Sequence, residues 1–208
     1  NSKNFHATTN LLEGLNYSDI IFIIVPTPNG GGEKFYDHSI LSNLLLKINK
    51  HKVKNKSLII GCTVMPGYIR DVANLLIKDC ENTTINYNPE FIAQGSIVKD
   101  QVNADMVLIG EANPTVGNLI ENVYIDHCKS NPRVCRMDRI SAEITKLSLN
   151  CFLTTKISFA NMIGDISNKV GGETDKILEA IGSDSRIGNK YLRWGYGYGG
   201  PCFPRDNR

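Results

Sequence analysis

The chain has 208 residues, 41% of them hydrophobic, and a net charge of +2 at pH 7. It is therefore long enough to bury a sizeable core and to hold one domain and part of another. Acidic and basic residues are interspersed, which argues against a nucleic-acid or membrane-surface partner, and no apolar run reaches the roughly 18 residues of a membrane span.

The first two thirds of the chain alternate between strand and helix patterns. Residues 19–25, DIIFIIV, form a β-branched run that Pro-Thr-Pro ends, which is typical of a strand buried on both faces of a parallel sheet. We expect further strands at 57–64, 83–87, 106–109 and 133–137, and helices at 36–50, 67–80 and 114–129. This alternation predicts that residues 1–137 are the C-terminal portion of a doubly wound, Rossmann-like α/β domain, whose ligands lie beyond the carboxyl ends of the strands.

From about Asp138 the alternation stops, and residues 138–208 are assigned to a second, helical domain. Apolar residues recur every three or four positions over some thirty residues, which predicts a long central helix with Asp138 or Ser141 as its cap. A short helix at 173–181 and a turn at 189–193 are expected to follow.

The glycine-rich stretch 195–206, GYGYGGPCFPRD, carries the strongest functional signal. Its glycines allow positive φ angles and leave no side-chain bulk between the backbone and a ligand. Cys202 follows them, with Arg205 and Asp206 three and four residues further on, a setting that can hold a thiolate and manage its proton. A packed thiol in a glycine-rich loop is the alternative.

The six cysteines form no CxxC pair and no spacing typical of a metal site. We therefore expect no metal, and reduced thiols in a cytoplasmic protein. Five of the cysteines lie among apolar neighbours or in helical segments, where packing explains them. Cys202 alone lies in a loop suited to access.

Lys146 and Asn150 form a KxxxN pair near the start of the predicted long helix. Their side chains emerge one turn apart on the same face. By spacing alone, a solvated Lys/Asn pair is the favoured interpretation.

Four motifs occur together in one order: VPTP at 25–28, NPEF at 88–91, the KxxxN pair and the cysteine loop. In this combination the chain resembles the nucleotide-sugar dehydrogenase family, nearest to its UDP-glucose branch, over most of its length. The resemblance implies NAD-dependent, four-electron oxidation of the C6 alcohol of a nucleotide sugar such as UDP-glucose, through a thiohemiacetal and a thioester on Cys202. It also implies a homodimer or higher homo-oligomer assembled through the long helix.

The resemblance carries roles onto individual residues. Lys146 and Asn150 would stabilise an oxyanion, Asp206 and Thr63 would hold the catalytic water, and Glu90 would be a polar or acid/base partner. The residues expected to bind NAD are Val25, Thr27, Pro28, Thr63 and Arg205. Those expected to bind the substrate are Phe91, Ile92, Gln94, Arg186, Tyr198 and Gly199. Ordinary strand-end or capping chemistry is the alternative for the two threonines.

Two positions depart from the family pattern. Gln94 stands where the UDP-glucose branch commonly has a second glutamate, and glutamine can position water without taking its proton. Arg205 stands where lysine is usual, which keeps the charge and changes the hydrogen-bond geometry.

A dinucleotide fingerprint is missing, because residues 29–33, NGGGE, follow a strand without GxGxxG spacing. Since the family has that turn in an earlier βα unit, we expect the chain to be a piece of a longer protein, inactive by itself. Three alternatives stay open. They are a dehydrogenase of another nucleotide sugar (a UDP-N-acetylhexosamine or GDP-mannose), a two-electron β-hydroxyacid-type dehydrogenase that shares only KxxxN, and a non-catalytic remnant that dimerises.

Overall fold

The computed structural model describes residues 5–30, 36–93 and 95–207. The chain divides into two units, one made of Asn1–Thr27 and Tyr36–Thr145, the other of Pro28–Phe35 and Lys146–Arg208. The division falls inside the long helix, and the domain boundary at 137/138 stays a prediction.

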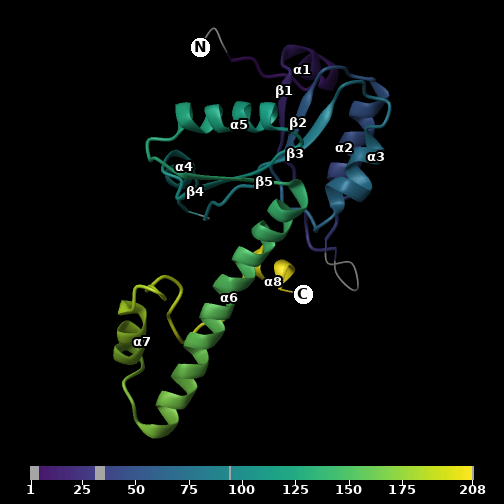
Figure 1. The fold of residues 1–208 in the computed structure, drawn as a ribbon. Helices are drawn as coiled ribbons and strands as arrows, with labels where there is room; N and C mark the ends of the chain where they lie inside the picture. The colour runs from purple at the N-terminus through teal and green to yellow at the C-terminus, as the bar shows by residue number, and fades with distance from the viewer. Residues whose placement is uncertain (1–4, 31–35, 94, 208) are drawn as a thin grey trace. The chain divides into compact units, whose positions relative to one another are not determined.

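A five-stranded sheet forms the centre of the first unit (Figure 1). In spatial order the strands are β1 (Ile20–Ile23), β2 (Ser57–Ile60), β3 (Thr84–Tyr87), β4 (Met106–Gly110) and β5 (Arg133–Met137). β1 and β2 run parallel, as do β2 and β3 and also β4 and β5, whereas β3 and β4 pair antiparallel through Tyr87 and Gly110. The predicted α/β fold is therefore confirmed with a mostly parallel sheet, and the antiparallel step is a feature that the strand patterns did not indicate.

The central strands β2, β3 and β4 are buried on both faces. The prediction of a strand buried on both faces was wrong for the first run, 19–25, because Phe22 of β1 is 38% exposed and Ile24 after it is 61% exposed. In β2, Leu58 and Ile60 join one apolar cluster and Ile59 between them joins another. The first cluster includes the buried face of α2 (Ser39–Lys50), and the second includes that of α5 (Pro114–His127). Because alternate strand residues point to opposite faces, these two helices cover opposite faces of the sheet (Figure 1).

The remaining helices of the first unit are short. The helix expected at 67–80 consists of a π-helical segment η1 (Ile69–Ala73) and α3 (Asn74–Leu76). Neither α1 (Leu11–Tyr17) nor α4 (Ile97–Val102) was predicted from the sequence. With 7 and 6 residues they are too short to display a helical period.

The long helix is α6 (Arg139–Val170), whose 32 residues give it a length of about 48 Å at 1.5 Å per residue. Asp138 caps it, because Ser141 donates its backbone N–H to Asp138 Oδ1 at 3.0 Å. The helix was expected, with either Asp138 or Ser141 as its cap, and the structure identifies Asp138. No helix among the described residues combines the length and the hydropathy needed to cross a bilayer.

The second unit contains only helices and turns among its described residues, as predicted. α7 (Thr174–Ser183) packs against α6 through a small apolar cluster of Ala160, Leu178 and Leu192. A last helix, α8 (Phe203–Asp206), forms part of the glycine-rich stretch that was expected to be a loop.

Candidate active site

Several predicted site residues of the first unit follow the carboxyl ends of neighbouring parallel strands. Val25 and Thr27 follow β1, Thr63 follows β2 and Glu90 follows β3. The ladder continues past the strands, since Gly61 N–H donates to Ile23 O at 2.9 Å and Asn88 N–H donates to Ile60 O at 2.9 Å. The structure therefore brings these segments to one edge of the sheet, the edge beyond which doubly wound folds bind ligands.

The segment after β3 is fixed by a buried asparagine. Asn88 donates from Nδ2 to Leu108 O at 2.9 Å and accepts from the Tyr124 hydroxyl at 2.7 Å. Its role is thus to tie the end of β3 to β4 and α5. Glu90, two residues on, accepts from Gln101 Nε2 of α4 at 3.1 Å.

A pocket of about 300 Å³ opens beside this segment, within the first unit. Glu90, Phe91 and Ile92 line it, together with side chains of β1, β4 and α5. Two residues expected to contact substrate are therefore brought together with the candidate acid/base partner. Gln94, the third in this run, lies outside the described residues.

The residues expected to hold NAD divide between the two units. Thr27 is buried, Val25 and Thr63 are partly buried, and all three lie at the strand edge, which fits a cofactor in the crevice beyond it. Pro28 and Arg205 belong to the second unit. The pyrophosphate-binding GxGxxG turn is not among the printed residues.

In the second unit, α6 holds the end of the cysteine loop through the predicted KxxxN pair. Lys146 is buried, and Asn150 donates from Nδ2 to Asp206 Oδ2 at 2.7 Å. Cys151 donates from Sγ to Asp206 O at 3.1 Å, and Thr154 Oγ1 donates to Asn207 Oδ1 at 2.6 Å. Three α6 side chains one turn or less apart therefore fix Asp206 and its neighbour.

Asp206 receives a second side-chain donor from within α8. Arg205 Nε donates to Asp206 Oδ1 at 2.7 Å, and the exposed fractions of the two side chains are only 7% and 0%. Asn150 and Arg205 thus bind different oxygens of one buried carboxylate. This pairing is a contact that the sequence did not indicate for Arg205.

Cys202 directly precedes α8 and is the one exposed thiol among the six cysteines, all of which are described. Its neighbour Phe203 makes edge-on ring contacts with Tyr198 and Tyr191, at centroid distances of 6.2 and 6.4 Å. At Gly199 a built Cβ would meet no atom within 4 Å, so the backbone before the thiol is open on that side. The structure thus presents an accessible thiol beside an aromatic cluster.

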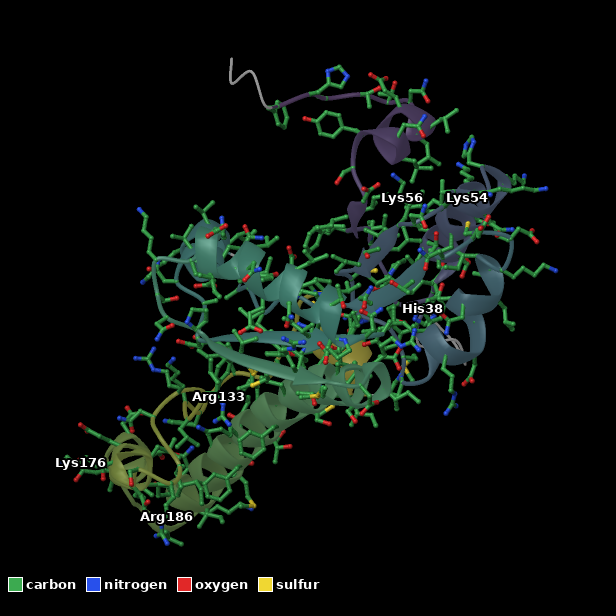
Figure 2. The ribbon with its side chains drawn as sticks, turned by 45° about the horizontal axis from the view of Figure 1, so that its top comes forward. His38, Lys54, Lys56, Arg133, Lys176 and Arg186 are labelled. Atoms are coloured by element: carbon green, nitrogen blue, oxygen red, sulfur yellow. The ribbon has the colours of Figure 1, made fainter. Side chains whose placement is uncertain are left out.

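Arg186, expected to reach a nucleotide sugar, lies on the loop after α7 with 85% of its side chain exposed (Figure 2). It binds Asp184 in a two-pronged contact, Nε to Oδ1 at 3.0 Å and Nη2 to Oδ2 at 2.6 Å. The hydrogen bond from Arg186 lowers the pKa of Asp184. The guanidinium is therefore a surface group with one ordered carboxylate partner.

Sequence reasoning missed several residues that position the site. Cys151 and Thr154 continue the face of α6 that begins at Lys146 and Asn150, and that periodicity was the available signal. Glu143 is fully buried and accepts from the backbone N–H groups of Gly67 and Ile69 at 2.6 and 3.0 Å, and burial raises its pKa. No local pattern marked it.

The described residues contain no group of three His, Cys, Asp or Glu side chains that would hold a metal ion. The chemistry available in the second unit therefore rests on a thiol, an amine, a carboxamide and a carboxylate. A thiol can act as a nucleophile, and the other groups can bind an oxyanion or a water molecule.

Two family models match the chain in succession. The NAD binding domain of the UDP-glucose/GDP-mannose dehydrogenase family matches residues 1–127, and the central domain of the same family matches residues 140–208. The first match alone covers more than half of the chain.

Individual relatives agree with these models. A UDP-glucose 6-dehydrogenase of Bacillus subtilis (strain 168) is 36% identical over 205 residues, covering 95% of this chain and 45% of that protein. The solved structure of a UDP-glucose dehydrogenase from Pyrobaculum islandicum has a TM-score of 0.87 at 28% identity, over 96% of this chain and 46% of that one. A GDP-mannose dehydrogenase structure from Pseudomonas aeruginosa has a TM-score of 0.79 at 27% identity, over 96% and 47%. The chain thus spans about half the length of the relatives that it matches.

Proposed function

Because the chain belongs to the UDP-glucose/GDP-mannose dehydrogenase family, we propose that the whole protein oxidises the C6 alcohol of UDP-glucose to the carboxylate. Residues 1–127 match the NAD binding domain of this family. The observation that carries the proposal is the exposed Cys202 thiol, attached to a helix whose Asp206 is bonded to Asn150 of the KxxxN pair.

The thiol matters because it distinguishes the reaction from a simple alcohol oxidation. Oxidation of an alcohol to an aldehyde needs only a base and a hydride acceptor. Oxidation of the aldehyde to an acid also needs a nucleophile that adds to the same carbon. The Cys202 thiolate adds to the aldehyde to give a thiohemiacetal, loss of hydride gives a thioester, and water releases the carboxylate and the thiol. NAD, when bound, accepts the hydride in each of the two oxidations.

The neighbouring residues have distinct tasks in this proposal. Lys146 and Asn150 stabilise the oxyanion that forms at the reacting carbon, since an ammonium and a carboxamide both donate hydrogen bonds to negative oxygen. Asp206 is assigned the water that cleaves the thioester, with Thr63 as a second partner of water and Glu90 as an acid/base partner. Because its carboxylate is buried between Asn150 and Arg205, Asp206 must exchange one of these partners for the water.

The assignment of UDP-glucose as the substrate rests mainly on the names of the relatives and less on residues of this chain. The Bacillus subtilis relative carries the UDP-glucose name, whereas one solved relative is a GDP-mannose dehydrogenase. Gln94 stands where the UDP-glucose branch commonly has a second glutamate. This difference is the main reason in the sequence to test other nucleotide sugars as substrates. Arg186, Phe91, Ile92, Tyr198 and Gly199 are the proposed substrate contacts.

We also propose a homodimer that forms through α6, in which a second copy covers an apolar stripe. Its members Phe152, Phe159, Met162, Ile166 and Val170 are each at least 38% exposed. At 100° per residue they fall within an arc of about 80° on one side of the helix. A long stripe of this kind suits a second, identical helix.

The cysteines favour the cytoplasm as the compartment of this protein. None of the six, all of which the structure describes, forms a disulfide, and cysteines stay reduced in the cytoplasm.

Counting NADH tests the four-electron reaction. The whole protein, supplied with limiting UDP-glucose and excess NAD, should form two NADH per sugar and an acidic product. One NADH per sugar would favour the two-electron alternative instead. If the protein oxidises GDP-mannose or a UDP-N-acetylhexosamine faster than UDP-glucose, that sugar replaces UDP-glucose as the assigned substrate, and the proposed thiol mechanism is unaffected.

A further inference from the structure

The loop that carries Cys202 begins at a single side chain of α6. Asn161 accepts from Gly195 N–H through Oδ1 at 2.8 Å and donates from Nδ2 to Tyr196 O at 2.8 Å. Only one orientation of the carboxamide satisfies both partners, because one is a donor and the other an acceptor. Asn161 therefore fixes two adjacent backbone groups at the start of the loop, one through each end of its carboxamide.

A second contact supports the same end of the loop. The indole of Trp194 packs so closely on Gly164 of α6 that a Cβ there would lie 2.7 Å from Trp194 Cε3. Trp194 Nε1 donates to Asp175 Oδ1 of α7 at 3.2 Å. Asn161 and Gly164 are three residues apart and share one face of α6, so residues 194–196 are fixed at one level of the helix.

The other end of the loop is fixed at a different level. Asp206 is bound by Asn150 and Cys151, and its backbone N–H donates to Cys202 O at 2.9 Å. Asn150 and Asn161 are separated by about 16 Å along the axis at 1.5 Å per residue. The loop thus runs along α6 between two anchored ends.

Between these ends Tyr198 contacts Phe203 edge-on, at a ring-centroid distance of 6.2 Å. The space beside the glycines is open, since a Cβ built at Gly197, Gly199 or Gly200 would meet no atom within 4 Å. Glycine also leaves the backbone more conformational freedom than any other residue does. The position of Cys202 therefore depends on the anchors at both ends of the loop as well as on this aromatic contact.

We infer that Asn161 is a positioning residue for Cys202, an inference that rests on the proposed role of this thiol as the nucleophile. Asn161 fixes the entry of the loop, whereas Lys146, Asn150 and Asp206 are held independently on α6 and α8. Loss of Asn161 therefore lowers kcat for the step that needs the thiol and spares kcat for the interconversion of alcohol and aldehyde.

The test compares two reactions of the whole protein, both followed by NADH absorbance. One is oxidation of the C6 aldehyde of UDP-glucose with NAD, which needs Cys202, and the other is reduction of that aldehyde with NADH. In Asn161→Ala the oxidation should fall by about tenfold to a hundredfold, as expected for a reacting group displaced by about 1 Å. The kcat of the reduction should stay within about twofold of wild type, because that step does not need the thiol. Weaker substrate binding through Tyr198 and Gly199 would appear as a higher KM in both reactions, so the comparison is made on kcat.

Two further variants separate positioning from packing. Asn161→Asp keeps the size of the side chain and the acceptor for Gly195 but sets a carboxylate oxygen against Tyr196 O, so it should impair aldehyde oxidation as well. Asn168→Ala, at an exposed asparagine two turns further along α6, should behave as wild type. Wild-type behaviour of Asn161→Asp would overturn the inference, because then only side-chain volume would matter.

Hydrogen exchange of residues 195–202 gives a readout that does not depend on catalysis. It should rise in both Asn161 variants and not in Asn168→Ala. Unchanged exchange, or a parallel loss of both reactions together with a lower Tm, would overturn the positioning role. Cys202→Ser is measured alongside: if it still forms the acid, the proposed function fails, whereas an inactive Cys202→Ser beside a fully active Asn161→Ala refutes only the role of Asn161.

Discussion

Asn150 and Asp206, 56 positions apart in the chain, are joined by a 2.7 Å hydrogen bond between Nδ2 and Oδ2. The bond connects the KxxxN pair with the helix that follows Cys202. The opposite oxygen of Asp206 binds Arg205, and the carboxylate has no exposed surface. Two motifs that the sequence presents separately are thus parts of one hydrogen-bonded cluster.

Asp206→Asn should destabilise the protein. An amide has a single acceptor oxygen, so either Asn150 or the buried Arg205 would face an NH2 group. We expect a loss of about 3 kcal/mol in the free energy of unfolding, the cost of breaking a buried ion pair from one side. Urea unfolding measures it.

The control for this variant is Asp184→Asn. It breaks a carboxylate–guanidinium pair whose arginine, Arg186, is 85% exposed. Exposed ion pairs contribute about 0–1 kcal/mol to the free energy of unfolding, so the urea midpoint of Asp184→Asn should change little. Equal shifts in the two variants would contradict the structural role of Asp206.

The thiols should differ in reactivity in the native protein. Iodoacetamide should modify Cys202 first because it is exposed. Cys151 should react slowly, since burial and the nearby Asp206 raise the pKa of its thiol and its Sγ donates to Asp206 O. Peptide mass spectrometry over a time course measures both rates, and all six thiols should react alike in denaturant. A native Cys151 as fast as Cys202 would refute this arrangement.

Sequence reasoning succeeded where the signal is local. Apolar runs placed the five strands, three-and-four spacing placed α6, and the glycine-rich run predicted correctly that the Cys202 thiol is accessible. It failed where the cause is a contact between distant residues: Tyr124 with Asn88, 36 positions apart, and Asn161 with Gly195, 34 positions apart. The antiparallel pairing of β3 and β4 was missed for the same reason, because strand direction is set by tertiary packing.

Gly117→Ala should destabilise the first unit although alanine is the better helix former. A Cβ at Gly117 would overlap the carboxylate of Glu111, which Arg136 Nη2 contacts at 2.7 Å. We expect a loss of about 1–3 kcal/mol from overpacking. At Gly14 in α1 a Cβ would meet nothing within 4 Å, so Gly14→Ala should gain up to about 1 kcal/mol. Urea unfolding of both variants checks the contrast, and a stabilising Gly117→Ala would refute the predicted clash.

The proposed dimer predicts that a charge in the apolar stripe of α6 lowers the oligomeric state. Phe152→Lys and Ile166→Lys place an ammonium among exposed apolar side chains, which a second helix would have to desolvate. Asn168→Lys on the opposite side of α6 is the control. Sedimentation velocity should give a dimer for wild type and control and a smaller species for the stripe variants. A dimer that survives both stripe substitutions would place the interface elsewhere.

The central claim is that Cys202 forms a covalent bond with the substrate, and product analysis of Cys202→Ser tests it most directly. Wild-type protein should convert the C6 aldehyde of UDP-glucose to the acid, and a rapidly quenched sample should carry a substrate adduct on the peptide that contains Cys202. Cys202→Ser should yield neither acid nor adduct while still reducing the aldehyde with NADH, because the hydroxyl is a far poorer nucleophile at neutral pH. Acid formation at the wild-type rate by Cys202→Ser would contradict the account.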